Sequence, residues 1–425
     1  MSCPICFFRD SHQRALKVKT FSIDRFEFKL SKYKELYLEE LKNLTGLREC
    51  DCYNSYTSES LCLWIDEFLS DINLNIDLIE ETFNTINSCY TKFINENQRA
   101  AINHLYDFLE SSSLINRQVG SSDLVRTLFR ARWKSDFDPK SIKEFYHVPF
   151  SKRHLVGSQR FSIPGLPLLY LGSSILTVEK ELEAQENSYL EYSAFLPSYS
   201  HIYDFKIFDL TNSINSLLEN NLPGIMDSVN YPYSDGNNFS YSHRFRSEIQ
   251  ANILLQICTF PTEFKCSFIP EYVIPQMLTS ALQENGFNGL SFPSTKCFDS
   301  LKDNHRFSSH HLNFVIFTKN HINKDQDDDL LNRFFTFTLN KYPDVDTKKV
   351  LAKIEDVCKI NRSTDVNNTD FVMPLVRAKL QIEYLEKSSI NGVSYFKTDT
   401  GNTELSLYLD IINHMHRIVT ARVEE

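Results

Sequence analysis

The sequence predicts an α+β protein in which a central mixed β-sheet is flanked by N- and C-terminal helical modules. Eleven of the 14 prolines lie between Pro139 and Pro293, and seven of the 11 glycines lie between Gly157 and Gly289. Turns are therefore concentrated in the middle of the chain. Residues 61–93 repeat apolar side chains at steps of three and four, which is typical of amphipathic helices.

The order of the expected elements gives three modules. Helices are expected at residues 61–93 and 97–109, and the polar, Gly/Ser-rich residues 111–123 form a boundary. The middle alternates between strands and helices. Strands are expected at residues 124–132, 168–172, 203–208, 264–274, 289–292 and 312–317, and helices at 174–185, 242–258 and 275–284. Further helices are expected at residues 330–339, 347–359, 373–386 and 403–419. We place the modules at residues 1–118, 119–322 and 323–425.

Composition excludes several classes of protein. The 425 residues are 42% hydrophobic and include 33 Phe and 20 Tyr, so the chain can fill a core. The formal net charge of -10 argues against a protein whose main task is to bind nucleic acid. Ten cysteines in this length do not suggest a disulfide scaffold, and we expect neither a signal peptide nor a membrane span. These observations predict a soluble cytoplasmic protein.

The most informative stretch runs from Leu124 to Leu182. Arg130 closes an expected strand, and Arg160 precedes a Gly/Pro turn. Tyr170 lies in an apolar strand, which is followed by a helix that carries Glu179 and Glu181. Taken singly, such residues are most often surface charges or core aromatics. Their order in the sequence is what indicates a site.

Four sequence blocks resemble, in order, those of the RES domain family. They are LFRAR, GSQRFSIPGLPLLYLGSS with the VEKEL helix, NGFNGLSFPSTK and HHLNFVIF. The resemblance covers residues 124–317, roughly half of the chain. It implies a fold like that of ADP-ribosyltransferases and the activity of a bacterial toxin or antiphage defence effector that degrades NAD. It also implies an NAD glycohydrolase, a phosphorylase or an ADP-ribosyltransferase.

The resemblance assigns roles to six residues. Arg130, Glu181 and Ser294 match the catalytic positions, whereas Arg160, Tyr170 and Asn313 match substrate-binding positions. A carboxylate near the ribose would stabilise the positive charge that develops when the nicotinamide–ribose bond breaks. Glu181 lies eleven residues after Tyr170, as in the family, so we favour it over Glu179. The family's Gly-Gly-Arg is Gly-Ser-Gln-Arg in this sequence.

Cysteines near the N-terminus indicate a metal site. Cys3 and Cys6 form a CxxC pair, Cys50 and Cys52 form a CxC pair, and four thiolates could hold a structural zinc tetrahedrally. The CPICF block resembles the opening of a longer branch of the family, often called HEPN/RES. In that branch the second pair is also CxxC. Cys62 could therefore replace one ligand, and all of these residues could also be ordinary reduced thiols.

Two other functions stay open. Arg99 and His104 match the loose Arg-x4-His motif of HEPN ribonucleases, which cut RNA without metal. A nonenzymatic sensor of ADP-ribose or a nucleotide is the other alternative. An enzyme that consumes NAD would endanger its own cell, so we also expect an inhibitor protein or self-association as a control.

Overall fold

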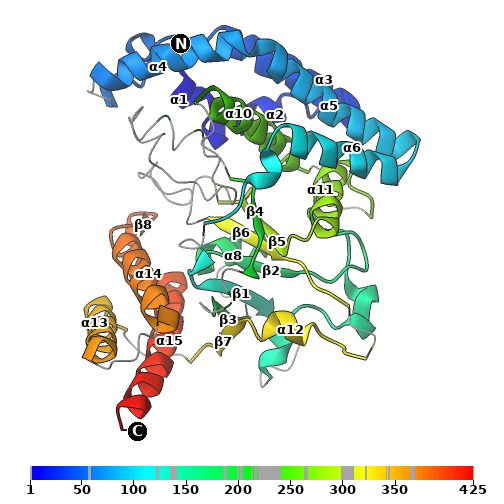
Figure 1. Cartoon of the computed structure of the whole chain (residues 1–425). Helices are drawn as coiled ribbons and strands as arrows, with labels where there is room; N and C mark the ends of the chain where they lie inside the picture. Colours follow the sequence, from blue (N-terminus) through cyan, green and yellow to red (C-terminus); the bar gives the residue numbers. More distant parts are fainter. Residues whose placement is uncertain are drawn as a thin grey trace. The chain divides into compact units, whose positions relative to one another are not determined.

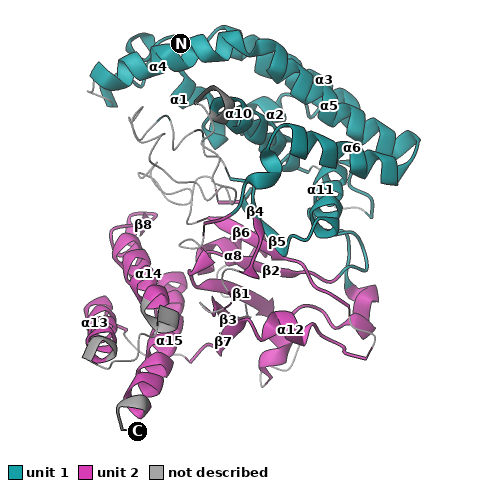
Figure 2. Cartoon of the chain, in the orientation of Figure 1, with its two compact units in different colours: residues 1–118, 156–166, 208–295 teal, residues 119–155, 167–207, 296–425 magenta. Residues whose placement is uncertain are grey.

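The computed structural model folds into two compact units (Figures 1 and 2). Unit 1 comprises residues 1–118, 156–166 and 208–295, and unit 2 comprises residues 119–155, 167–207 and 296–425. The structure describes residues 2–55, 59–120, 124–134, 141–184, 189–198, 201, 204–211, 214, 218, 241–262, 267–297, 311–320, 323–340, 342, 345–363 and 369–424. These units do not coincide with the three predicted modules, whose bounds stay a prediction.

Unit 1 is mainly helical. Its α-helices are α1 (Pro4–Phe7), α2 (Asp10–Val18), α3 (Phe26–Lys42), α4 (Glu59–Leu74), α5 (Ile76–Asn95), α6 (Gln98–Ser111), α10 (Tyr241–Cys258) and α11 (Val273–Glu284). Short 3-10 helices include η1 (Leu47–Glu49), η2 (Tyr53–Ser55) and η8 (Pro270–Tyr272). Fully buried rings of Tyr33 and Tyr37 contact Phe83 and Phe260 edge to face, so aromatic packing builds this core.

Of the seven strands in the larger sheet of the described residues, five belong to unit 2. They are β1 (Leu128–Trp133), β2 (Leu169–Gly172), β3 (Leu190–Pro197), β6 (Leu312–Ile316) and β7 (Phe334–Thr338). Their order is β6-β2-β1-β3-β7, and each neighbouring pair is antiparallel. The other two, β4 (Ile207–Asp209) and β5 (Gly289–Pro293), belong to unit 1 except for Ile207. The α+β class is confirmed.

Helices cover one face of the unit 2 sheet. They are α8 (Ile175–Glu181), α13 (Thr347–Ser363), α14 (Thr369–Glu386) and α15 (Asp399–Glu424), in Figure 1 from green to red. Phe129, Ala131 and Ala194 of the strands share a buried cluster with these helices, and we call this side the helical face. Leu128, Leu169 and Phe195 belong to a second cluster, with η5 (Ile142–Phe145) and α12 (Asp328–Leu331), on the opposite face. Adjacent residues of a strand therefore face different layers.

Two secondary-structure predictions were wrong. Residues 330–339 do not form a helix, because α12 ends at Leu331 and the aromatic and β-branched sequence FFTFT forms β7 against β3. Residues 264–274 do not form a strand over their described part. Pro270 begins the 3-10 helix η8 there, and α11 follows from Val273. Residues 263–266 lie outside the described part. Strand β3 was not predicted, because its apolar pattern is interrupted by polar residues.

Candidate active site and candidate metal centre

The β2–α8 segment is shaped by three small residues. A Cβ atom on Gly172 would lie 2.6 Å from Cγ2 of Val178, so only glycine lets α8 pack against the end of β2. The Ser173 hydroxyl accepts a hydrogen bond from the backbone N–H of Leu312 at 2.9 Å, which ties the segment to β6. Ser174 is the N-cap residue, and its hydroxyl accepts from the N–H of Thr177 at 3.1 Å. The sequence Gly-Ser-Ser therefore starts α8 directly at the sheet.

Glu181 and Asn313 lie in contact at the end of this helix. The side-chain amide of Asn313 in β6 donates a hydrogen bond to Oε1 of Glu181 at 2.7 Å. Glu181 is half-buried and Asn313 is buried. A short bond from a buried amide restricts the rotamers of the carboxylate, so Glu181 is held in a defined orientation. Of the six predicted site residues, these two are joined directly through their side chains.

Glu179 points into a different environment. Its carboxylate accepts hydrogen bonds from the hydroxyls of Tyr192 and Thr400, each at 2.7 Å. Tyr192 belongs to β3, and Thr400 belongs to the first turn of α15. Both bonds anchor α8 to its surroundings in unit 2. The structure therefore gives the two glutamates different partners, as their spacing of two residues on a helix predicts.

Strand alternation divides the predicted residues of unit 2. Tyr170 lies between Leu169 and Leu171, which both belong to the opposite-face cluster, so its side chain is on the helical face. The same reasoning places Asn313 on the helical face. Arg130 alternates with Phe129 and Ala131, so its side chain leaves the sheet on the opposite face. The regular pairing of β1 with β3 leaves no bulge that would change this phase.

Arg130 makes a backbone contact within the sheet region. Its Nη1 donates to the carbonyl oxygen of Tyr170 at 3.1 Å. Burial lowers the pKa of its guanidinium to about 10, with a smaller contribution from Arg132. Arg130 thus bonds to the strand that carries Tyr170, and the structure does not bring its side chain to Glu181. Its predicted contact with substrate stays a prediction.

Arg160 and Ser294 belong to unit 1. Nη1 of Arg160 donates to the carbonyl oxygens of Cys258 at 3.1 Å and Phe260 at 2.8 Å, which caps the C-terminal end of α10. The guanidinium also lies 5.0 Å from the ring centroid of Tyr272. Ser294 follows β5 and is buried. The roles predicted for both residues at the active site stay predictions.

Lys296 is a neighbour of Glu181 that was not among the predicted site residues. Its Nζ donates to the carbonyl oxygen of Glu181 and to Oε1 of Glu183, each at 3.0 Å. This ammonium therefore lies at the C-terminal end of α8, where a cation is favoured by the helix dipole. Lys296 is the last residue of the block NGFNGLSFPSTK, which was the one available signal.

The four predicted cysteines form a compact cluster. Their sulfur atoms all lie within 4.8 Å of one another. The Sγ–Sγ distances are 3.5 Å for Cys3 and Cys52, 3.7 Å for Cys6 and Cys50, and 3.3 Å for Cys50 and Cys52. Cys3 caps α1 and Cys6 lies within it, while Cys50 and Cys52 lie between η1 and η2. Two local turns, far apart in the sequence, thus present their thiols to each other.

This geometry fits a zinc ion. Four sulfurs bound tetrahedrally at about 2.3 Å from zinc are separated from one another by about 3.8 Å. The measured separations are close to that value. A hydrogen bond from Cys3 lowers the pKa of the Cys6 thiol to about 5, so a thiolate forms readily in the cluster. The cluster can therefore bind a metal ion such as zinc without Cys62.

The Arg-x4-His residues have separate partners. Arg99 forms an ion pair with Glu284 of α11. Nδ1 of His104 accepts a hydrogen bond from Nζ of Lys92 at 3.1 Å, and His104 lines a cavity of unit 1. Burial and the neighbouring Lys92 lower the pKa of His104. Within unit 1 the two side chains do not converge on one point.

One curated relative is similar to this chain. The sequence is 26% identical over 264 residues to a protein of Bacillus subtilis (strain 168) named "Putative toxin YopC". The match covers 61% of this chain and 54% of that protein, so the chain spans about half the length of its relative. No protein-family model matches the sequence. No solved structure matches it either.

In the described ranges, every helix is too short or too polar to cross a bilayer.

Proposed function

We propose that the protein is a toxin that cleaves the nicotinamide–ribose bond of NAD and passes ADP-ribose to water, phosphate or a macromolecule. The observation that carries this proposal is the orientation of the Glu181 carboxylate by Asn313 at 2.7 Å. The similarity to a protein named as a toxin supports the biological role. The resemblance of residues 124–317 to the RES family supports the substrate.

The proposed reaction breaks one bond and forms one. The bond between C1′ of the ribose and the nicotinamide nitrogen breaks, and its electron pair neutralises the charged pyridinium ring. An oxygen of the acceptor then bonds to C1′, and the proton of the acceptor passes to solvent. The ribose becomes cationic in between, so a carboxylate held beside it stabilises the transition state. Glu181 is assigned this role, with Asn313 as its positioning residue.

Binding needs an aromatic face and a cation. Tyr170 lies on the same face of the sheet as α8 and is assigned to the nicotinamide ring. Arg130 leaves on the opposite face, so the diphosphate requires another cation near Glu181. Lys296 meets this requirement, because its ammonium lies within 3.0 Å of the Glu181 carbonyl oxygen. We therefore add Lys296 to the proposed substrate-binding residues.

The test compares two glutamates of one helix. Purified protein is incubated with NAD, and free nicotinamide is measured over time. Glu181→Gln should lower kcat at least about 100-fold, because a neutral amide cannot stabilise the developing charge. Glu179→Gln keeps acceptor oxygen for Tyr192 or Thr400 and should retain most of the activity. Thermal unfolding of both variants controls for folding.

Three outcomes of this experiment would oppose the proposal. If wild-type protein leaves NAD intact, the proposed activity is refuted. Full activity of Glu181→Gln removes the role of Glu181. Loss of activity in Glu179→Gln alone moves the catalytic carboxylate to Glu179.

We further propose that the cysteine cluster holds a structural zinc. Cys3, Cys6, Cys50 and Cys52 would supply all four ligands, which leaves no open position for substrate. The zinc would join α1 to the η1–η2 turn and would take no part in the reaction. An inhibitor protein or self-association remains our proposal for control of the toxin.

A further inference from the structure

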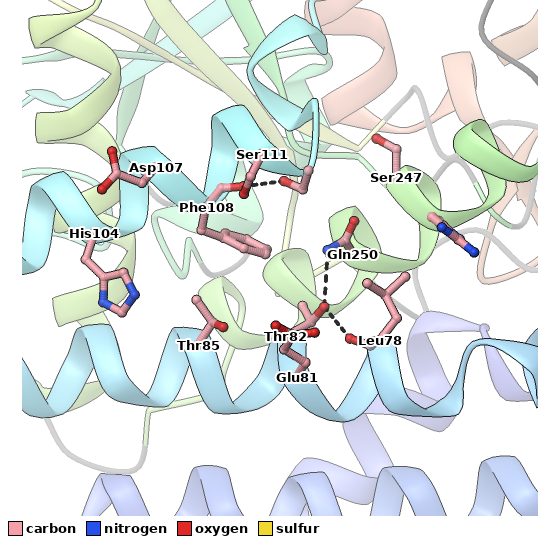
Figure 3. A pocket seen from close by; sticks show the side chains of 12 residues that line it. Leu78, Glu81, Thr82, Thr85, His104, Asp107, Phe108, Ser111, Ser247 and Gln250 are labelled. Atoms are coloured by element: carbon pink, nitrogen blue, oxygen red, sulfur yellow. Dashed lines mark hydrogen bonds between the residues drawn. The ribbon is translucent and has the colours of Figure 1, made fainter.

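A separate cavity lies between three helices of unit 1. Its volume is about 500 Å³, and Figure 3 shows the side chains that line it. This size is within the range of small-molecule sites in proteins. The lining comes from α5 (Leu78, Glu81, Thr82, Thr85), from α6 (His104, Asp107, Phe108, Ser111) with its C-cap residue Ser112, and from α10 (Arg246, Ser247, Gln250).

The lining offers neutral hydrogen-bonding groups around one aromatic ring. Gln250 donates to the hydroxyl of Thr82 at 3.4 Å, and Thr82 donates to the carbonyl oxygen of Leu78 at 2.8 Å. Ser247 is 1% exposed, and its hydroxyl has no hydrogen-bond partner among the described residues. This hydroxyl is itself shielded from the cavity, so the accessible hydrogen-bonding groups are those of Gln250 and the threonines of α5. Phe108 extends from α6 into the space between α6 and α5 (Figure 3).

The charges around the cavity disfavour anions. Glu81 and Asp107 contribute two carboxylates. The guanidinium of Arg246 is directed to Oδ1 of Asn75, to which its Nε donates at 2.9 Å. His104 adds little positive charge at neutral pH, because burial and Lys92 lower its pKa. Among the lining residues, the two carboxylates therefore outnumber the single guanidinium of Arg246, so a phosphate group would meet a net negative lining.

We propose that this cavity binds a nucleoside-type ligand that carries no phosphate. Its flat heteroaromatic ring packs against Phe108, and its polar edge bonds to Gln250. Ribose hydroxyls donate to the carboxylates of Glu81 and Asp107, which accept such bonds readily. The proposal does not depend on the cleavage of NAD, because all twelve lining residues belong to unit 1.

The test is calorimetric titration of the full chain with adenosine, cytidine and nicotinamide riboside as probes, and with AMP as the anionic counterpart of adenosine. We expect at least one nucleoside to bind with a Kd below 1 mM, on the order expected for so small a ligand. AMP should bind at least about tenfold more weakly than adenosine, because its phosphate is repelled by the carboxylates of the lining; this difference corresponds to about 1.4 kcal/mol.

Two threonines of α5 provide a matched pair of variants. Thr85→Phe fills the cavity and should weaken nucleoside binding at least about tenfold. Thr91 lies on the same helix, is exposed and does not line the cavity, so Thr91→Phe should leave binding unchanged. The double variant Glu81→Gln, Asp107→Asn should narrow the difference between adenosine and AMP. Thermal unfolding shows whether each variant is folded.

The proposal is overturned if none of the nucleosides binds at 5 mM, a concentration well above about 1 mM. It is equally overturned if AMP binds as tightly as adenosine, or if binding persists in Thr85→Phe. If the protein cleaves NAD but binds no nucleoside, only the proposed nucleoside site is refuted. If the protein binds a nucleoside but does not cleave NAD, the nucleoside site is supported and the proposed reaction is refuted.

Discussion

Glu404 of α15 should make the stability of the protein depend on pH. This carboxyl is 0% exposed. Its Oε2 accepts hydrogen bonds from the N–H of Ile175 at 2.8 Å and from the hydroxyl of Tyr395 at 2.7 Å. Burial raises its pKa from the ordinary value of 4.5 to about 7, and the nearby Glu179 acts in the same direction. Glu404 therefore forms a hydrogen bond with the first residue of α8. It also binds a proton more readily than an exposed glutamate does.

The sign of the effect follows from proton binding. Between pH 4.5 and about 7, the folded state keeps the proton of Glu404 and the unfolded state loses it. The free energy of unfolding therefore falls as the pH rises through this window, and the contribution is complete below it. Each unit of difference between the folded-state and unfolded-state pKa corresponds to about 1.4 kcal/mol. The loss in the free energy of unfolding is therefore limited to about 3 kcal/mol.

The substitution Glu404→Gln tests this reasoning. Glutamine keeps an oxygen for Ile175 and Tyr395 but cannot ionise. Urea unfolding is measured from pH 4 to 9 for the wild type, for Glu404→Gln and for the partly exposed control Glu383→Gln. The stability of Glu404→Gln relative to wild type should rise by up to about 3 kcal/mol across the window. A difference that is constant with pH would refute the argument.

Three further outcomes are expected. Cys6→Ser should abolish the proposed zinc binding, as measured by elemental analysis, and lower the Tm, because three sulfurs bind the ion less tightly than four. A full zinc content in this variant would contradict the proposed site. Lys29→Met should cost about 3–5 kcal/mol in urea unfolding, because Glu271 is left as a buried charge without its partner at 3.3 Å. Adding Glu271→Leu should recover much of that loss. Gly401→Ala should destabilise by at least about 1–3 kcal/mol, because a Cβ would lie 2.0 Å from the carbonyl oxygen of Tyr395; an unchanged Tm would contradict this.

Local signals explain which parts of the fold could be predicted from the sequence. The β2–α8 segment depends on Gly172 and Ser174, whose effects act within a few residues, and both were visible in the GSS sequence. Amphipathic spacing likewise revealed α5 and α6. In contrast, β7 was mistaken for a helix. Its strand form depends on pairing with β3, and those residues are more than 130 positions away.

In the candidate site, too, features set by local sequence could be predicted and contacts between distant residues could not. Because side chains alternate between the two faces of a strand, the sequence LFRARW already places Arg130 on the face opposite to Phe129 and Ala131. The sequence does not tell which face of the sheet receives α8, so the prediction treated Arg130 and Glu181 as neighbours. The contact between Glu181 and Asn313 spans 132 positions; the resemblance to a known family named both residues but did not predict that they bond to each other. The bond between Ile175 and Glu404 spans 229 positions and had no sequence signal.

The C-terminal helices give the predicted catalytic helix its support. Gln381 of α14 donates to the carbonyl oxygen of Ser173 at 3.1 Å, Thr400 bonds to Glu179, and Glu404 accepts from Ile175. A ligand or partner that displaced α15 would remove two of the three, and the orientation of α8 would loosen with them. Control of the proposed toxin through its C-terminal segment therefore requires no contact with NAD, because it can act on the helix that carries Glu181.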